Sequence, residues 1–222
     1  MVRLIGTVLV VSLALLFSSS FAHANSAELL TFDGLQNNQL VGNFYNGGGM
    51  PSTPNYGVSF SSNVFALLPV SRGGTGDFAP DPTASPAIFF NGIGANVTGT
   101  MNVANGFSSG INFFYTAAFT ETVKIWSGAN GTGTVLATMT LAANDGGCSP
   151  PAYCHWTNVG LALPSGATAG SVTFTGMGNG AGIADITLGQ SITGIPEPSS
   201  IYLLGTGLMG LCSQRMRRLL GM

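Results

Sequence analysis

Residues 111–116 read Ile-Asn-Phe-Phe-Tyr-Thr, a stretch in which large apolar side chains recur at every second position. In an extended chain successive side chains point to opposite faces, so Ile111, Phe113 and Tyr115 share one face. The same alternation recurs at 135–141, where valine, alanine, methionine and leucine share a face. This period of two predicts half-buried β-strands rather than helices.

Further short segments of this kind follow one another along the chain, separated by glycine- and proline-rich stretches. Val172 and Phe174 alternate with Thr173 and Thr175. The other predicted strands span 28–32, 56–60, 64–70, 87–90, 97–103, 122–126, 159–163 and 183–188. Short strands, scarce charges and many turn residues together predict an all-β fold, a jelly-roll-like β-sandwich.

The clearest turn joins the predicted strands at 123–127 and 135–141. Asn130 and Gly131 both tolerate positive φ, so the chain reverses there as a hairpin. A phosphate-binding loop is the alternative for the glycine-rich stretch 128–133. No Lys-Ser or Lys-Thr pair follows it, and the next pattern is a strand, so a structural turn is favoured.

The first 24 residues have the three parts of a secretory signal peptide. Arg3 precedes the apolar stretch 4–17, and Ala22 and Ala24 form an A-x-A cleavage site around His23. A transmembrane helix is the alternative, but the apolar stretch is too short for one and the cleavage site argues against it. The sequence therefore predicts export, with signal peptidase cutting after Ala24.

The segment 195–222 combines three features. Pro196, Glu197 and Pro198 form an extended, accessible motif, because proline cannot donate a backbone hydrogen bond and restricts the residue before it. The apolar run 201–212 would span roughly 18 Å as a helix, well short of a hydrocarbon core of about 30 Å. Three arginines follow it: Arg215, Arg217 and Arg218. They supply the cytoplasmic stop of the positive-inside rule, so the tail is typical of a transient pause at the inner membrane.

Motif, apolar run and basic end, in this order, resemble the PEP-CTERM sorting signal of Gram-negative bacteria. In that family an exosortase, a membrane cysteine protease or transpeptidase, is thought to cut near the motif and to release or re-attach the protein outside the inner membrane. The resemblance implies an exported protein at the cell surface or outside the cell, with exosortase as its processing partner. An ordinary short tail anchor, a helix that keeps the protein in the membrane, is the alternative.

Between the two targeting segments, residues 25–194 form one predicted domain. Arg72 and Lys124 are its only bases, against seven acids, so its formal charge is −5. This balance excludes a nucleic-acid partner, because phosphate binding needs clustered Lys and Arg.

Four segments of this domain resemble the sandwich domains that often precede PEP-CTERM tails, which are similar to carbohydrate-binding modules with a lectin-like jelly roll. The segments are 31–34, 128–136, 166–174 and 183–189. The resemblance implies a non-enzymatic protein that binds polysaccharide or structures the exopolysaccharide matrix. The last strand of such modules commonly carries Asp-Asn or Asp-Asp, whereas here Ala184 precedes a single Asp185.

Asp33 and Asp185 form the candidate cation site. If the first and last strands pair, as in many jelly rolls, these carboxylates could lie close enough to hold Ca²⁺, with backbone carbonyls and waters completing six to eight oxygen ligands. The alternative is that both are solvated or turn-capping aspartates.

Cys148 and Cys154 flank a short proline-containing loop, while the third cysteine, Cys212, lies in the sorting tail. In an oxidising, exported setting an even pair at this spacing predicts a disulfide. A metal site is the alternative, since His155 follows Cys154 directly. Tetrahedral zinc would need a fourth ligand, and the C-x-x-C spacing typical of metal and redox pairs is missing.

Two tryptophans mark the domain. Trp126 alternates with the apolar Val123 and Ile125, so we expect it on the outer face, where its indole could stack on a sugar ring; packing at the sheet edge is the alternative. Trp156 follows the predicted disulfide, and we expect it to cover that disulfide.

The sequence provides little support for catalysis. His155 is the one histidine left after removal of the signal peptide, so a Ser-His-Asp site would have to use it. A secreted polysaccharide hydrolase with a pair of carboxylates is the alternative to a binding protein, and Glu28 and Glu121 are the first acids to test for it.

Overall fold

The protein is described by a computed structural model over residues 27–48, 53–83 and 85–189. The predicted signal peptide, the sorting motif, the apolar run and the three arginines lie outside these residues. Within them, no helix has the length and apolar character needed to cross a bilayer.

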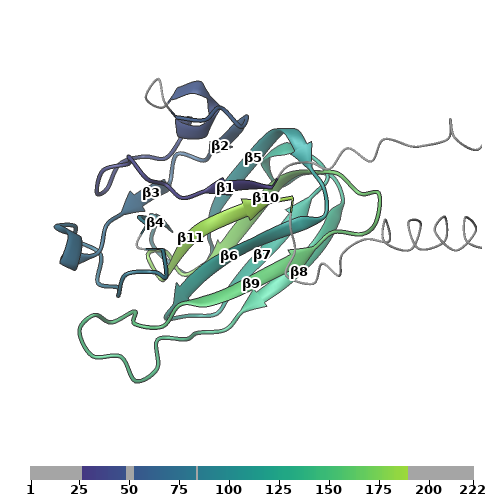
Figure 1. The fold of residues 1–222 in the computed structure, drawn as a ribbon. Coiled ribbons are helices and arrows are strands. Elements are labelled where there is room, and N and C mark those ends of the chain that lie inside the picture. The colour runs from purple at the N-terminus through teal and green to yellow at the C-terminus, as the bar shows by residue number, and fades with distance from the viewer. Residues whose placement is uncertain (1–26, 49–52, 84, 190–222) are drawn as a thin grey trace, which may run out of the picture.

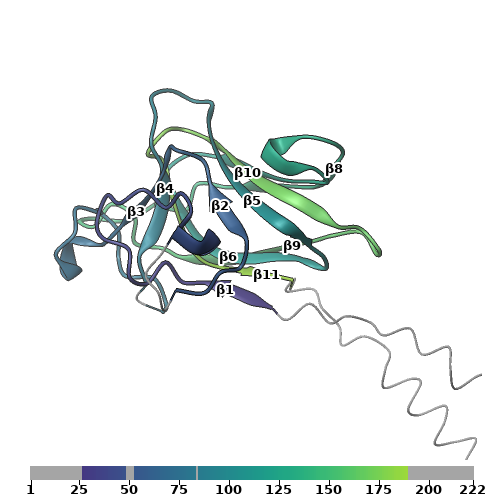
Figure 2. The ribbon, with the colours of Figure 1, turned by 90° about the horizontal axis from the view of Figure 1, so that it is seen from above.

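Two antiparallel sheets form separate layers (Figure 2). The first, sheet A, contains β1 (Glu28–Leu30), β3 (Val64–Leu67), β4 (Ala87–Phe90), β6 (Gly110–Ala117), β9 (Thr157–Ala162) and β11 (Ala181–Leu188). The second, sheet B, contains β2 (Val58–Phe60), β5 (Val97–Phe107), β7 (Glu121–Trp126), β8 (Val135–Leu141) and β10 (Ala169–Gly176). Short helical turns occupy Phe44–Gly48, Val70–Arg72 and Ala129–Gly131.

The strand order is that of a jelly roll. Strands β4 to β11 form two four-stranded sheets, ordered β4-β11-β6-β9 and β5-β10-β7-β8, as two interlocked Greek keys require. The three earlier strands extend the edges: β1 pairs with β11, β3 with β4, and β2 with β5 (Figure 1). The predicted all-β sandwich and the pairing of first and last strands are confirmed.

The core lies between the sheets and follows the period of two. Ile111, Phe113 and Tyr115 are all buried, as their alternation predicts. Rings from both sheets meet in the middle: Phe174 stacks on Phe90 at 5.4 Å and meets Phe113 edge-on at 5.6 Å. Such aromatic contacts add to the apolar burial that holds the two layers together.

One end of the outer face of sheet A, around Ala87 and Ala184, is covered by two loops, which we call the roof loops: residues 76–80 and 148–156. They run parallel beside each other, since Ala79 N donates to the Tyr153 carbonyl at 2.8 Å and Tyr153 N to the Asp77 carbonyl at 3.0 Å. Beneath them, Phe78 packs edge-on against Trp156 at 5.7 Å. This face carries small apolar residues such as Ala87 and Ala184, so covering it removes apolar area from water.

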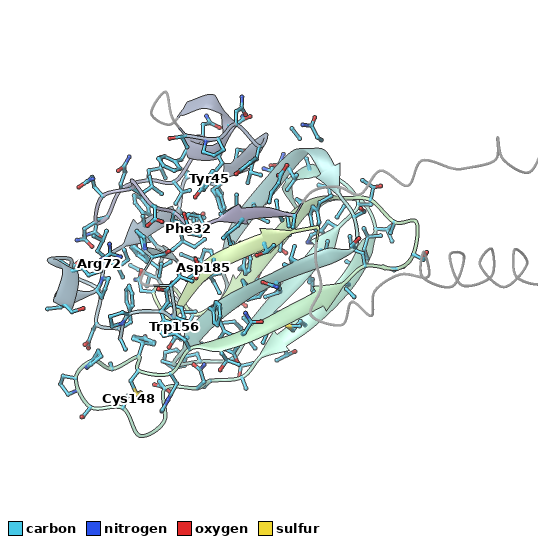
Figure 3. The ribbon with its side chains drawn as sticks, in the orientation of Figure 1. Phe32, Tyr45, Arg72, Cys148, Trp156 and Asp185 are labelled. Carbon is cyan, nitrogen blue, oxygen red and sulfur yellow. A yellow bond between two sulfur atoms is a disulfide. The ribbon has the colours of Figure 1, made fainter. Side chains whose placement is uncertain are left out.

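The predicted disulfide is confirmed. Cys148 and Cys154 are joined at 2.04 Å and close the tip of the second roof loop, which projects beyond the strand ends (Figures 1 and 3). Trp156 joins the two roof loops, and its predicted cover of the disulfide stays a prediction. Its recorded contacts are with Phe78 and with the Ala79 carbonyl, which accepts its indole N–H at 2.7 Å, so it fastens one roof loop to the other.

Candidate functional site

Trp126 lies on the outer face of β7, as its alternation predicts, and is half-buried. Its indole N–H donates to Thr173 Oγ1 at 2.9 Å, and the Lys124 ammonium lies 5.9 Å from the ring centroid. The hydrogen bond and the cation–π contact hold the indole in one orientation. Trp126 is therefore a rigid part of the outer surface of sheet B.

The predicted hairpin at Asn130 and Gly131 is present, and both residues have positive φ. What the sequence did not show is where this turn goes: it folds back across the outer face of sheet B. Asn102 Nδ2 donates to Asn130 Oδ1 at 2.8 Å, and Asn130 N donates to Asn102 Oδ1 at 2.7 Å. A further bond joins Gly131 N to Ser171 Oγ at 3.0 Å, so the turn is tied to both β5 and β10.

Beside this turn lies an open hollow of about 590 Å³, which we call the amide hollow. Its polar lining consists of amides and hydroxyls: Asn46, Ser59, Asn102, Asn105, Ser127, Asn130 and Thr168. Among the described residues that line it, none is charged or aromatic. In a domain with a formal charge of −5, this makes the hollow a local neutral surface.

Gly131 keeps the turn close to the sheet. A Cβ at this position would lie 2.9 Å from Thr173 Cγ2 and 3.7 Å from the Trp126 indole nitrogen. The residue also has φ +66°, which favours glycine. Trp126 and the amide hollow thus lie on either side of one tightly packed turn.

Asp185 and Asp33 are placed differently. Asp185 lies in a bulge of β11, where it and Ile186 together oppose one residue of β6, and its backbone has a φ of 52°. It is buried on sheet A (Figure 3). Asp33 is exposed in the turn after β1 and lines a separate hollow with Tyr45 and Tyr56.

The recorded partner of Asp185 is Thr83, whose hydroxyl donates to Oδ2 at 2.5 Å. The same hydroxyl lies 3.5 Å from Asp81 Oδ2, and Ser85 N donates to Asp81 Oδ1 at 2.8 Å. The second oxygen of Asp185, Oδ1, is buried without a hydrogen-bond partner among the described residues. The structure therefore connects Asp185 to Asp81 rather than to Asp33, and calcium binding by Asp33 and Asp185 stays a prediction.

Three potential metal ligands do meet at Cys148, Cys154 and His155, within 4.8 Å of one another. The two sulfurs are bonded to each other and are not thiolates, so this group is a disulfide beside an exposed histidine.

Glu28 and Glu121, the first acids to test for hydrolysis, lie at opposite ends of the sandwich. Glu28 pairs with Leu188 at the end of β11, whereas Glu121 accepts a hydrogen bond from the backbone of Met177, which precedes β11. The length of strand between them corresponds to roughly 20 Å. The carboxylates of a glycosidase lie about 5–9.5 Å apart, so these two do not form such a pair.

Glu121 is nevertheless unusual. It points inward from β7 and is 3% exposed, with Oε1 unpartnered among the described residues. Burial raises the pKa of its carboxyl to about 7, partly offset by the hydrogen bond from Met177. No local pattern marks this, because the residues around the carboxyl, Gly176 and Met177 among them, are distant from Glu121 in the sequence.

No family model matches this chain, and no curated protein sequence does. Among solved structures, a family 6 carbohydrate-binding module is 13% identical with a TM-score of 0.41, covering 74% of this chain and 94% of its own. A family 29 carbohydrate-binding module is 9% identical with a TM-score of 0.44, covering 78% and 99%. The adhesin domain of Lys-gingipain from Porphyromonas gingivalis is 12% identical with a TM-score of 0.41, covering 75% and 99%. At this level of similarity the matches carry no conclusion about ligand or function.

Proposed function

We propose that residues 25–194 are a non-enzymatic polysaccharide-binding domain, and that its ligand lies in the amide hollow of sheet B. The observation that carries the proposal is the lining of the hollow, which offers amides and hydroxyls but no charge among its described residues. Each amide side chain both donates and accepts, as each sugar hydroxyl does. The volume of about 590 Å³ lies in the range of ordinary ligand sites.

A neutral glycan suits this surface better than a charged one. A charged ligand would need an opposite charge to offset its desolvation, and the described lining supplies none. On the other side of the turn, the rigid Trp126 extends the surface with an apolar ring on which a further sugar unit can rest. The proposed ligand is therefore a chain of neutral sugars rather than a single ring.

A hydrolase is the weaker candidate. Glu28 and Glu121 lie too far apart to act as a pair, and Asp81 and Asp185, which share the Thr83 hydroxyl, are each 4% exposed. A general acid must reach the glycosidic oxygen, which buried carboxylates of this kind do not.

The predicted signal peptide and the predicted sorting signal support a proposal for how the protein is exported. We propose that signal peptidase cuts after Ala24 and that an exosortase then processes the tail at Pro196, Glu197 and Pro198. The protein would pause at the inner membrane of a Gram-negative cell and finish at the surface or in the exopolysaccharide matrix. In a host with an exosortase, mass spectrometry of the secreted protein should find 201–222 missing, and Glu197→Ala should retain the uncut chain in the membrane. Secreted protein with an intact C-terminus would refute processing.

The binding proposal is tested by titrating the purified full chain with soluble neutral polysaccharides, namely a β-glucan, a xylan and a galactomannan. Asn105 is exposed, lines the hollow and makes no recorded hydrogen bond, so Asn105→Ala should not affect folding. We expect it to weaken binding about three- to tenfold, the value of one hydrogen bond.

The matched control is Asn158→Ala, an exposed asparagine on β9 of the opposite sheet. It should leave the affinity unchanged. The proposal is overturned if none of the three polysaccharides binds, if both variants lose the same affinity, or if the protein shortens the glycan chains.

A further inference from the structure

A second cavity lies on the opposite side of the molecule, between the roof loops and the outer face of sheet A. Its volume is about 250 Å³, below the roughly 300–1,000 Å³ of sites for drug-sized ligands. Its floor includes Ala87, Thr116 and Gly182, from the neighbouring strands β4, β6 and β11. Small side chains on the floor and loops above leave room for one ring.

Aromatic side chains form the walls. Phe78 is held edge-on by Trp156 beneath the roof loops, while Phe89 of β4 and Tyr153 of the second roof loop are half-buried. All three line the cavity. Such walls favour a ligand with an apolar ring face or a cation.

The polar groups of the cavity have mainly acceptor capacity left. The amide nitrogen of Asn38 already donates to Thr75 Oγ1 at 3.3 Å, and that of Asn179 to the Gly92 carbonyl at 3.2 Å. The two amide oxygens accept no recorded hydrogen bond from the described residues, and neither does the carboxylate of the exposed Asp77. A ligand that supplies donors, such as hydroxyls or an ammonium, complements this set.

Thr116 adds an unsatisfied group at the floor. It is 1% exposed, and its hydroxyl oxygen has no hydrogen-bond partner among the described residues. Leaving a buried hydroxyl unpaired costs about 1–3 kcal/mol. Such unpaired groups are rare in folded proteins, and a bound ligand is one partner that would satisfy this hydroxyl. A threonine side chain has more than one staggered rotamer, and a ligand hydroxyl on the floor of the cavity can accept or donate to it.

The surroundings of the cavity are acidic. Burial raises the pKa of Tyr153, and the charges of Asp145, Asp77 and Glu121 raise it further. Among the basic residues of the described chain, Lys124 lies on sheet B over Trp126, and neither Arg72 nor His155 is among the residues of the cavity. An anionic ligand would meet repulsion without a compensating base.

We infer that the cavity under the roof loops is a second binding site, for one sugar-sized ring rich in hydrogen-bond donors, and that it selects amino and neutral sugars against acidic ones. The carboxylate of Asp77 at the cavity pairs with a ligand ammonium, the amide oxygens of Asn38 and Asn179 accept from hydroxyls, and the aromatic walls cover the ring. This site does not depend on the amide hollow, which lies on the other sheet.

The test compares three methyl β-glycosides of the same ring: glucosaminide, glucoside and glucuronide. Each is titrated into the full chain at about pH 6, where the amine is protonated, and binding is followed by calorimetry and by chemical shifts of the roof-loop amides. We expect the glucosaminide to bind at least threefold more tightly than the glucoside and the glucuronide not to bind at millimolar concentration. Equal or tighter binding of the glucuronide, or binding of none of the three, overturns the inference.

Asp77→Asn then tests the assignment of the carboxylate. Asp77 is exposed and makes no recorded side-chain bond, so the variant should fold normally. It should bring the glucosaminide-to-glucoside ratio close to one while the glucoside affinity stays within about twofold. Asp33→Asn, an exposed acid at a different hollow, is the control and should leave the ratio as it is. An unchanged ratio in Asp77→Asn contradicts the proposed pairing.

The proposals for the amide hollow and for the cavity under the roof loops can be refuted independently of each other. Asn105→Ala should weaken polysaccharide binding without changing glucosaminide affinity, and Asp77→Asn should do the reverse. If Asn105→Ala weakens both, the monosaccharide binds in the amide hollow and the second site is wrong. If the glycosides bind and depend on Asp77 but no polysaccharide binds, the amide hollow is wrong and the second site stands.

Discussion

The outer faces of the two sheets differ, although the same alternation of residues builds both. Sheet B exposes threonines, asparagines and Trp126, and one turn folds across it without closing it. One end of sheet A presents small apolar residues such as Ala184 together with Phe114, and the roof loops cover that end. A polar outer face can remain open to water, whereas an apolar one is stable only when covered, so the second roof loop and its disulfide belong to sheet A.

We expect the largest loss of stability from a substitution that removes part of the cover over sheet A. Phe78→Ala removes a side chain that is 6% exposed and packs on Trp156, so we expect a loss of about 3 kcal/mol in the free energy of unfolding. Urea denaturation measures it. Phe119→Ala, in which the deleted ring is 49% exposed, should cost well under half as much. Equal losses would mean that the roof loops contribute little to stability.

Reduction of the disulfide should have the next largest effect. Opening the short loop between Cys148 and Cys154 costs about 2 kcal/mol in the chain-entropy model. Because only the roof loops are affected, glucosaminide binding should weaken while polysaccharide binding stays constant. The double variant Cys148→Ser, Cys154→Ser should show the same loss and no response to reductant. A parallel loss at the amide hollow would contradict the independence of the two faces.

Glu121 lies in the interior of the sandwich, away from both outer faces, and its contribution to stability depends on pH. Its pKa in the folded protein is about 7 against 4.5 for an ordinary glutamate, so the folded state holds a proton that the unfolded state has lost between these values. The protonated Glu121 carboxyl therefore contributes fully to the free energy of unfolding below pH 4.5, and this contribution is lost as the pH rises through 7.

Glu121→Gln should remove this dependence and stabilise the protein above pH 7 by an amount on the order of 1 kcal/mol. Thermal unfolding followed across the pH range measures it, with Asp33→Asn as the control. A slope that survives in Glu121→Gln would assign the titration to another group.

Thr116→Val should have the smallest effect on folding. The change keeps the shape of the side chain and removes a hydroxyl that has no partner in the described protein, so the free energy of unfolding should stay level or rise by up to about 1 kcal/mol. Urea denaturation compares it with Thr187→Val, a half-exposed threonine of β11. A loss of more than about 1 kcal/mol would mean that the hydroxyl is satisfied within the fold.

Most of the fold could be predicted because its signals are local. Each segment expected as a strand contains a strand in the structure, and the alternation at 111–116 correctly places Phe113 inside. Edge position limited the prediction at 135–141. Val135 is 40% exposed and Leu141 only 1%. Because β8 is the edge strand of sheet B, its first residue is exposed to solvent while its last residue is buried.

The candidate site was predicted less well. Trp126 was placed on the outer face, but its bond to Thr173 depends on the register between β7 and β10. The pairing of Asn102 with Asn130 joins residues 28 positions apart, and no local pattern marks it. The link between Thr83 and Asp185 spans 102 positions and requires the bulge in β11.

The amino-acid sequence by itself determined the strands, the hairpin at Asn130 and Gly131, and the disulfide between Cys148 and Cys154, because side-chain alternation, positive φ and the closure of a short loop all act over a few residues. Tertiary structure alone decided which polar groups meet, which carboxyl is buried and which face of the sandwich is covered. The physical reason is that hydrogen bonds and burial depend on distances in space, and these are set by strand register and by the packing of one sheet on the other.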